Sequence, residues 1–393
     1  MRLLSKHLIA AALLMGVPVA AQISYAASQA SKLPWTANDK DRSAPVNVIF
    51  DTDMWSDIDD ALALAMLHAL QDRHEINLVA VTVSTGDKWC ASYVDLVNTF
   101  YGHPRVPIGL VRNGLDTAAF RRIYPSVTWP TTRYTELLSE ERNKDGTLMY
   151  PHRLLDGSKA PEAVSLLRKT LMAQPDGSVV MIQVGYSTNL ARLLDSAADV
   201  VSPLKGRDLV RQKVRLLSVM AGNFGESTGD GSILAKGSPE FNLKSDVPSA
   251  QELFSNWPTA IVASGFEIGK AMLYPAVSIE RDFSYVEHHP IAETYRTYAE
   301  ETSSRWPHAH ATYDLTAVLY AVRPDRDYFS LSKPGRITVL PDGGSRFDES
   351  ENGSHRYLIL SEAQKARTLE AMVMLVSQPP QRSSSGWHGH SAE

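Results

Sequence analysis

The chain has 393 residues, of which 44% are hydrophobic, and carries 39 Lys and Arg against 44 Asp and Glu, a formal charge of −5. A protein this close to neutrality lacks the positive charge that binds phosphate backbones or anionic lipid, so nucleic acid and membrane surfaces are not expected partners. With 21% charged and 8% aromatic residues and no internal repeat, the composition is typical of a globular protein with one large core or about two or three smaller domains.

Residues 1–26 have the pattern of a secretory signal peptide. Arg2 and Lys6 precede an apolar run that is broken by Pro18, and small residues follow it at a suitable cleavage site. The run is too short for a transmembrane anchor, and no later stretch is apolar enough to span a bilayer. We therefore expect a periplasmic or secreted protein without a membrane anchor, in which residues 27–44 form a flexible linker.

Cys90 is the only cysteine. An intramolecular disulfide and a cysteine-rich zinc site are therefore excluded. A nucleophilic role would need a basic neighbour that lowers the thiol pKa, and Lys88 alone is weak support, so we expect a buried structural residue.

Apolar strand-like runs alternate with helical segments through the central part of the chain. In chain order the pattern predicts strands at 46–51, 76–83, 106–111, 178–185, 214–222 and 259–265, and helices at 58–70, 92–101, 161–174, 188–195 and 249–257. This alternation predicts an α/β fold with an open, mostly parallel sheet flanked by helices. Ligands on such sheets bind beyond the carboxyl ends of the strands.

The part after Gly265 has a different pattern. It predicts helices at 292–306 and 313–322, a small hairpin over 335–347 and 355–360, and a last helix at 361–377. We expect this part to be a small appendage on the same core, so that residues 45–379 form one domain. Residues 380–393 are polar and low in complexity, which predicts a disordered tail, although its two histidines leave metal binding as an alternative.

An acidic turn from Asp51 to Asp60 carries the strongest chemical signal. It holds five carboxylates in ten residues, without Lys or Arg, where the first strand is expected to end. Two carboxylates about 4 Å apart repel by roughly 4 kcal/mol at an effective dielectric near 20, so several at one strand end need a cation or protons. A hard divalent cation, calcium above all, fits oxygen ligands of this kind. The alternative is that the aspartates cap the following helix, which explains one or two of them but not five; the spacing excludes an EF-hand.

The segment FDTDMWSDIDDALALAML (50–67) resembles the amino-terminal signature of the inosine-uridine nucleoside hydrolase family. Further segments resemble that family in the same order: VTVSTGD (81–87), VGYSTNLARLL (184–194), VMAGNF (219–224), PEFN (239–242) and YDLTAVLYAV (313–322). The likeness extends from about Val46 to Val322. It implies an exported bacterial member with an open α/β sheet and a calcium ion at the carboxyl ends of the strands, and the family commonly forms dimers or tetramers, so a homo-oligomer is expected.

The resemblance also implies individual roles. The calcium ligands would be Asp53, Asp60, the main-chain carbonyl of Val184, and Asp314. The substrate-binding residues would be Asp59, Asp87, Trp89, Asn223, Glu240 and Asn242. Without the other motifs, Glu240 and Asn242 would be read as part of a surface turn.

The implied reaction is hydrolysis of the N-glycosidic bond of a ribonucleoside to free base and ribose. Such hydrolysis passes through an oxocarbenium-like sugar and needs an activated water. Asp53 would take the proton of a water held at the cation, and coordination of the ribose hydroxyls would favour ribosides over deoxyribosides.

Three positions depart from the family pattern. The acidic loop is two residues longer than the shortest form and adds Asp57, which is read as a helix cap or a residue behind the metal ligands. Asp87 stands where Asn is common, which leaves its sugar contact in doubt. Tyr313 replaces the histidine that protonates the leaving base in pyrimidine-tolerant members.

An aromatic residue at position 313 is expected to activate the base by stacking, which favours a protonated purine. Trp89 or Trp55 would form the opposing face, although ordinary packing is an alternative for both. His308 and His310 are candidates for the missing acid, but nearby histidines are more often surface residues.

Two further functions remain open. A non-catalytic calcium-loaded protein that binds a riboside or sugar would need the same cluster but no acid. A magnesium-dependent phosphohydrolase that forms an aspartyl phosphate would use Asp51 and Asp53, although such loops normally continue with Gly and Thr rather than Met54 and Trp55.

Overall fold

The computed structural model describes residues 44–55, 57–116, 119–120, 122, 133–225, 227–229, 232–302 and 309–381. The chain divides into two units, Met1–Ala37 and Asn38–Glu393, and all described residues belong to the second. The predicted signal peptide at 1–26, nearly all of the predicted linker at 27–44, His308, and residues 382–393 of the predicted tail lie outside the described residues.

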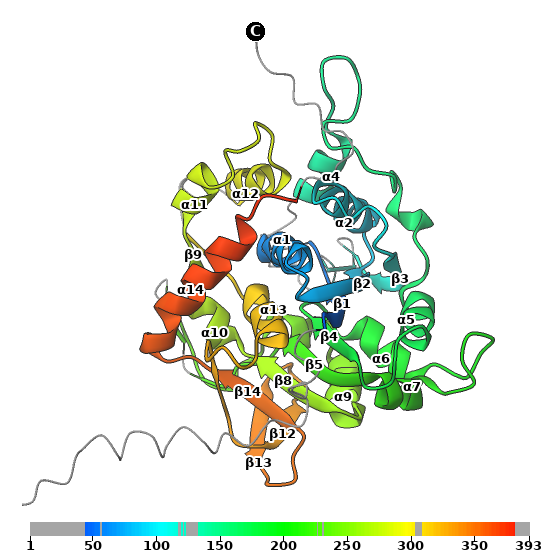
Figure 1. The fold of residues 1–393 in the computed structure, drawn as a ribbon. Helices are drawn as coiled ribbons and strands as arrows, with labels where there is room; N and C mark the ends of the chain where they lie inside the picture. The colour runs from blue at the N-terminus through cyan, green and yellow to red at the C-terminus, as the bar shows by residue number, and fades with distance from the viewer. Residues whose placement is uncertain are drawn as a thin grey trace, which may run out of the picture. The chain divides into compact units, whose positions relative to one another are not determined.

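A ten-stranded sheet forms the centre of the fold, in the order β13-β12-β14-β8-β5-β4-β1-β2-β3 with β11 paired to β14 (Figure 1). Its strands are β1 (Val46–Thr52), β2 (Ile76–Thr85), β3 (Ile108–Leu115), β4 (Val179–Gln183), β5 (Val214–Met220), β8 (Ala260–Ser264), β11 (Ser330–Leu331), β12 (Gly335–Val339), β13 (Ser345–Glu349) and β14 (His355–Ile359). Neighbouring strands from β14 to β3 run parallel, whereas β11, β12 and β13 add antiparallel pairs. Two short antiparallel pairs lie apart from it: β6 (Ser227–Gly229) with β7 (Ser232–Leu234), and β9 (Leu273–Tyr274) with β10 (His310–Ala311).

Helices cover both faces of the sheet. They are α1 (Asp59–Asp72), α2 (Lys88–Phe100), α4 (Tyr134–Glu140), α5 (Ala163–Met172), α6 (Thr188–Asp195), α7 (Gly206–Lys213), α8 (Phe241–Ser245), α9 (Val247–Asn256), α10 (Phe266–Ala271), α11 (Ala276–Arg281), α12 (Pro290–Glu301), α13 (Asp314–Val322) and α14 (Glu362–Val376), with a 3₁₀ turn at Gly157–Lys159. In Figure 1, α1, α13 and α14 lie on one side of the sheet and α5, α6, α7 and α9 on the other. None of the described helices combines the length and the apolarity needed to cross a bilayer.

The strand order reverses beside β1, which places a ligand crevice there. The chain adds β2 and β3 on one side of β1 and then returns to place β4 on the other. In open α/β sheets, ligands bind at such a reversal, outside the carboxyl ends of the strands. The crevice therefore lies between the segments that follow Thr52 and Gln183.

Helix α1 is buried along nearly its whole length. Its sequence is rich in Ala and Leu without a polar face, and every residue except Gln71 is buried. A helix that is apolar all round belongs in a core, and here α1 packs between the sheet, α13 and α14. This burial fixes the position of Asp59 and Asp60, which occupy its first turn.

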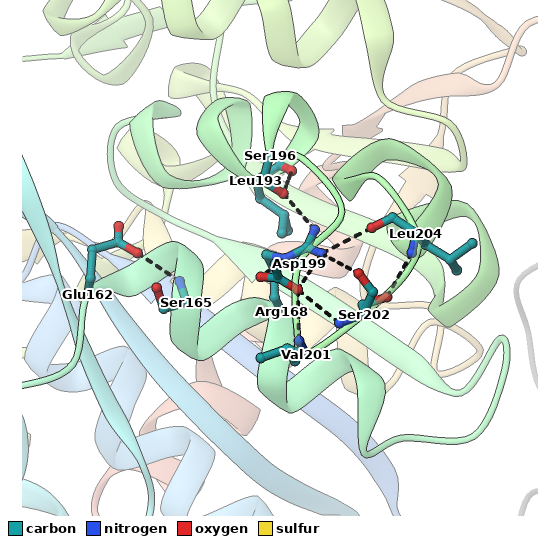
Figure 2. A network of polar contacts seen from close by, with 9 residues as sticks. All are labelled: Glu162, Ser165, Arg168, Leu193, Ser196, Asp199, Val201, Ser202 and Leu204. Atoms are coloured by element: carbon teal, nitrogen blue, oxygen red, sulfur yellow. Dashed lines mark hydrogen bonds and ion pairs between the residues drawn. The ribbon is translucent and has the colours of Figure 1, made fainter.

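A buried arginine joins α5 to the loop that follows α6 (Figure 2). Arg168 is 2% exposed and makes five hydrogen bonds of 2.8–3.2 Å. Two go to the carboxylate of Asp199, one to the hydroxyl of Ser196, and two to the carbonyls of Ser202 and Leu204. The guanidinium charge is thus matched entirely by groups of the chain.

The structure confirms the α/β class but changes the C-terminal part. The expected appendage continues the main sheet, because β14 pairs in parallel with the edge of β8 and carries β12 and β13 with it. The third strand begins at Ile108 and ends at Leu115, later than predicted. The short helices α4, α7, α8, α10 and α11 were not predicted, because segments of five to eight residues carry too few turns for a clear helical period.

Candidate functional site

A cavity of about 350 Å³ lies at the carboxyl ends of β1, β4 and β5. It is lined by Asp53, Asp57, Asp59, Asp60, Val184, Met220, Asn223, Pro239, Glu240, Phe241, Asn242, Lys244, Phe266, Tyr313 and Asp314. The lining thus combines carboxylates from three separate segments with an apolar and aromatic wall. Such a concave site with convergent polar groups is typical of small-molecule binding.

Three of the carboxylates converge closely. One carboxylate oxygen each from Asp59, Asp60 and Asp314 lies within 4.8 Å of the other two, and all three side chains are buried. Among the described residues this is the only group of three or more potential metal ligands. Asp53 lines the same cavity, and burial, together with the charges of Asp60 and Asp59, raises the pKa of its carboxyl.

The loop after β1 places these carboxylates through local hydrogen bonds. Asp60 Oδ1 accepts from the hydroxyl of Thr52 and, at 3.1 Å, from the main-chain N–H of Met54. Met54 has a φ of 42°, in the left-handed region that non-glycine residues rarely adopt. This strained residue directly follows Asp53, and local backbone strain of this kind is typical of a functional loop.

Burial and mutual repulsion raise the pKa of each carboxyl in the cluster. Burial, followed by Asp60, holds the pKa of Asp53 well above its usual range. Burial, followed by Asp59, does the same for the pKa of Asp314, and burial raises the pKa of Asp60 to about 6. The chain therefore does not supply the positive charge that this group of carboxylates needs.

A divalent cation fits this donor set. Several buried carboxylates converge on one point, and Lys244 is the one basic side chain among the described residues that line the cavity. Carboxylate oxygens are the ligands that calcium and magnesium prefer, and a bound cation would offset both the burial of these carboxylates and the repulsion between them, which together raise the pKa values. The cluster could accordingly hold a metal ion, with Asp59, Asp60 and Asp314 as its nearest donors.

Asp59 also caps helix α13. Its Oδ2 accepts hydrogen bonds from the main-chain N–H groups of Tyr313, at 2.7 Å, and Asp314, at 3.0 Å. The start of α1 is thereby tied to the start of α13, 254 residues later. This contact brings Asp314 to the cluster, and it occupies one oxygen of Asp59, the residue to which the family resemblance assigns a ribose hydroxyl.

Asp57 differs from the carboxylates of the cluster because it is paired with a histidine, His310. His310 Nε2 lies 2.6 Å from Asp57 Oδ1, and the hydroxyl of Tyr134 donates to the Asp57 carbonyl. Burial lowers the pKa of His310, but the charge of Asp57 outweighs it, so the pKa is raised overall. His310 does not line the cavity; it pairs with the extra residue of the acidic loop.

The opposite wall comes from the segments after β4 and β5. Asn242 Nδ2 donates to the carbonyl of Val184 at 2.9 Å and to that of Met220 at 3.2 Å. A carbonyl oxygen has two lone pairs, so Val184 keeps one for a further ligand. Glu240 accepts from the N–H groups of Gly222, Asn242 and Leu243, and burial raises its pKa to about 7.

Asn223 presents an unsatisfied acceptor in this wall. Its side chain is 1% exposed, and its Nδ2 donates to the carbonyl of Ala235 at 2.9 Å. Its Oδ1 has no hydrogen-bond partner among the described residues. Because buried acceptors are almost always paired, a ligand that donates a hydrogen bond suits this position.

Tyr313 and Phe266 form a stacked aromatic pair at the cavity. Their ring centroids are 5.1 Å apart and their planes are inclined by 26°. The close approach depends on Gly269 in α10, where a Cβ would lie 2.4 Å from Tyr313 Cα and Cδ1. Tyr313 is therefore held against Phe266, a residue that the sequence did not identify.

The structure places two of the predicted substrate-binding residues, Asp87 and Trp89, outside the cavity lining. Asp87 caps helix α2, its carboxylate accepting from the N–H of Trp89 at 3.0 Å, and neither residue lines the cavity. The ammonium group of Lys88 lies 4.3 Å from the centre of the Trp89 ring. Trp55 packs against Phe120, with ring centroids 5.2 Å apart, also outside the lining.

Other lining residues were missed. Met220, Pro239, Phe241, Lys244 and Phe266 lie in the cavity wall, but apolar residues at strand ends resemble core residues in sequence. The family motifs are the available signal, since PEFN (239–242) includes Pro239 and Phe241, and VMAGNF (219–224) includes Met220. Cys90 is buried, as expected, and burial raises the pKa of its thiol, which is contrary to a nucleophilic role.

Residues 48–374 match the profile of the inosine-uridine preferring nucleoside hydrolase family. No protein of curated function matches the sequence. Among solved structures, a purine-preferring ribonucleoside hydrolase from Gardnerella vaginalis is 16% identical with a TM-score of 0.60, the match covering 84% of this chain and 98% of that one.

Two other structures show the same fold. The plant nucleoside hydrolase PpNRh1 is 17% identical with a TM-score of 0.62, the match covering 85% of this chain and 100% of that one. An inosine-uridine preferring nucleoside hydrolase from Bacillus anthracis is 15% identical with a TM-score of 0.57, over 84% and 99% of the two chains. The fold, the buried acidic cluster and the match over most of the sequence lead to one assignment: the chain belongs to the inosine-uridine preferring nucleoside hydrolase family, whose members are N-glycosidases.

Proposed function

We propose that this protein is an exported, calcium-dependent nucleoside hydrolase that releases the base from ribonucleosides, with a preference for purines. The observation that carries the proposal is the convergence of Asp59, Asp60 and Asp314 beside Asp53 in a cavity large enough for a small ligand. These carboxylates have no basic partner adequate to their charge among the described lining residues. The sequence of residues 1–26 supports export.

The proposed metal ligands are Asp53, Asp60, Asp314 and the carbonyl of Val184. Asp59, which the resemblance gives to the ribose, has a carboxylate oxygen in the same group and is an additional candidate ligand. Calcium, when bound, would neutralise the cluster and polarise the attacking water and the sugar hydroxyls. Calcium is favoured over magnesium because it accepts more carboxylate ligands in a less strict geometry.

The chain's own residues would perform the remaining steps. Asp53 takes the proton of the attacking water as general base. The carboxylates around it favour the positive charge that develops on the sugar in an oxocarbenium-like transition state. The unsatisfied Oδ1 of Asn223 accepts a hydrogen bond from a sugar hydroxyl, and Glu240 and Asn242 hold the same end of the sugar.

Purine preference is proposed from the aromatic wall. Tyr313 and Phe266 offer stacked rings beside the cluster, and an aromatic face stabilises a protonated base by cation–π attraction. A phenol is a poor proton donor at neutral pH, so stacking is the more effective contribution of Tyr313. The solved structure from Gardnerella vaginalis is described as a purine-preferring enzyme, which accords with this proposal.

A panel of nucleosides incubated with the mature protein, with calcium or with a chelator, tests the proposal. We expect free base and reducing sugar from inosine, guanosine or adenosine in calcium, little from the deoxyribonucleosides, and almost none after chelation. A folded protein that binds ribose in calcium but releases no base would instead be a sugar-binding protein. Turnover of p-nitrophenyl phosphate in magnesium would favour the phosphohydrolase.

A further inference from the structure

The turn that joins β12 to β13 reaches the wall of the cavity from the edge of the sheet. Within the turn, Gly343 N–H donates to the Leu340 carbonyl at 3.0 Å, and Leu340 N–H donates to the Gly344 carbonyl at 2.8 Å. Gly343 has a φ of 84°, which favours glycine. The turn is therefore closed by its own hydrogen bonds and is fixed in shape.

Ser345, the first residue of β13, holds the segment that carries Asn223. Its hydroxyl oxygen accepts from the main-chain N–H of Asn223 at 2.9 Å and lies 3.3 Å from the Asn223 carbonyl. Ser345 N–H donates to the carbonyl of Gly237 at 3.2 Å, and Gly237 N–H donates back to the Asn223 carbonyl at 2.9 Å. Ser345 is 4% exposed and does not line the cavity, so it contacts the wall from behind.

The same turn contacts the start of α8. The N–H of Glu240 donates to the Gly343 carbonyl at 3.3 Å. A Cβ added to Gly343 would lie 2.4 Å from Lys244 Cβ and 2.5 Å from Lys244 Cα, so the turn packs directly on the helix backbone. The turn thus supports both segments of the opposite wall, those of Asn223 and of Glu240 and Asn242.

We propose that Ser345 is a positioning residue for substrate binding, which acts through Asn223, and that the Leu340–Gly344 turn does the same for Glu240 and Asn242. The inference rests on the proposed function, because it takes this wall to hold the sugar. The acidic cluster comes from β1, α1 and α13 and receives none of these contacts. Ser345 therefore acts on the sugar-binding residue Asn223 without contacting the carboxylates proposed to hold the metal.

Ser345→Ala tests the inference in steady-state hydrolysis of inosine. The substitution removes an acceptor from a buried N–H, and the loss of about one hydrogen bond corresponds to a roughly five- to tenfold rise in KM. We expect kcat to change less than KM, and the dissociation constant for calcium, measured by calorimetry, to stay unchanged. Gly343→Ala should raise KM further, because its Cβ displaces the α8 backbone.

Ser202→Ala is the matched control. Ser202 is 1% exposed, and its hydroxyl likewise accepts a main-chain N–H, that of Leu204 at 3.2 Å, but it lies in the loop of the Arg168 network. The Ser202→Ala variant should lose about as much free energy of unfolding as Ser345→Ala, but its KM for inosine should stay at the wild-type value.

In an Asn223→Ala background, Ser345→Ala should lose most of its effect on KM, because the effects of coupled residues are not additive. Equal KM values for Ser345→Ala and Ser202→Ala, or full additivity with Asn223→Ala, would overturn the inference.

Amide hydrogen exchange separates this inference from the proposed function. In Ser345→Ala we expect faster exchange across residues 221–243 and unchanged exchange across 51–60, with neither change in Ser202→Ala. If the wild-type protein hydrolyses no riboside while this exchange pattern holds, the proposed function fails and the structural link remains. If the wild type is active and exchange at 221–243 is unaltered, the positioning role is wrong.

Discussion

Two regions of this molecule that bury charged side chains are built in opposite ways. In the Arg168 network, one guanidinium meets a carboxylate, a hydroxyl and two carbonyls, so the charge is balanced within the chain (Figure 2). In the acidic cluster, buried carboxylates face one another and the pKa of each is raised. A charged group buried without a partner costs free energy, so the first region stabilises the fold and the second leaves a deficit that a cation would remove.

The largest expected effect of this contrast is on turnover. Asp314→Asn removes one donor of the cluster, and we expect kcat/KM to fall by roughly a thousandfold, since a metal supplies several kcal/mol of transition-state stabilisation. Arg168→Met should leave kcat/KM within about twofold, because its partners lie outside the cavity lining. Comparable losses in the two variants, measured with inosine, would remove the functional distinction between the regions.

The same two variants should change stability in opposite directions. Arg168→Met removes the five hydrogen bonds of a buried guanidinium, and we expect the free energy of unfolding to fall by about 3 kcal/mol. Asp314→Asn, without metal, relieves repulsion and should raise it by about 1 kcal/mol. Urea denaturation in a chelator measures both, and a loss of stability in metal-free Asp314→Asn would show that the cluster is balanced in some other way.

Stabilisation by calcium should depend on pH. Burial raises the pKa of Asp60 to about 6, and the pKa of Asp53 and Asp314 lies well above the usual value of 3.8. A carboxyl whose pKa is raised by folding contributes stability below its unfolded pKa and loses it as pH rises through the folded value, so the metal-free cluster loses stability as pH rises from about 4 through the folded pKa values, which for Asp60 is about 6.

We therefore expect the rise in Tm on adding calcium to be small at pH 5 and to grow towards pH 8. Histidines elsewhere in the chain titrate in both states, so their effect cancels when the Tm of the metal-free protein is subtracted from that of the calcium-loaded protein at each pH. Arg168 lowers the pKa of Asp199 to about 2, so Asp199 stays ionised between pH 5 and pH 8 and does not contribute to the pH dependence of stability in that range. A calcium effect that is constant between pH 5 and pH 8 would contradict the raised pKa values.

Tyr313 tests what the cavity adds to the metal cluster. Tyr313→Ala removes a stacking surface, and we expect kcat for inosine to fall about tenfold while calcium affinity stays the same. Tyr313→Phe keeps the ring against Phe266 and should stay within about twofold of the wild type. If Tyr313→Phe is as impaired as Tyr313→Ala, the hydroxyl rather than the stacked ring is responsible.

The smallest expected effect is that of Asp87, an acidic residue near the site with an ordinary structural partner. Its carboxylate caps α2, so Asp87→Ala should lower the free energy of unfolding by about 1 kcal/mol. KM for inosine should change by less than about twofold, because Asp87 does not line the cavity. A tenfold rise in KM would instead support the sugar contact that the family resemblance implies for Asp87.

Much of the architecture was accessible from the sequence because it depends on local patterns. The alternation of apolar strands and helices predicts the parallel sheet, and the acidic turn after the first strand marks the crevice where the strand order reverses. The family resemblance added Asp314, which no spacing argument places beside Asp60. Its position depends on the hydrogen bonds between Asp59 and the start of α13, a contact between distant segments.

The rest depends on tertiary contacts that no local pattern reports. The extension of the sheet by β12, β13 and β14 follows from pairing with β8, and the support that Ser345 gives to Asn223 spans 122 residues. Phe266 and Lys244 enter the cavity wall from short helices without a clear period. Asp87 is acidic and close in sequence to the site, yet its partner is the N–H of Trp89.

Calcium titration of the chelated mature protein tests the central claim most directly. Calorimetry at pH 6.5 in two buffers of different ionisation enthalpy measures both the stoichiometry and the protons displaced by the metal. We predict one ion per chain, release of protons on binding, and loss of the site in Asp314→Asn. Absence of calcium binding by a folded protein, or binding that Asp314→Asn leaves unchanged, would contradict the account.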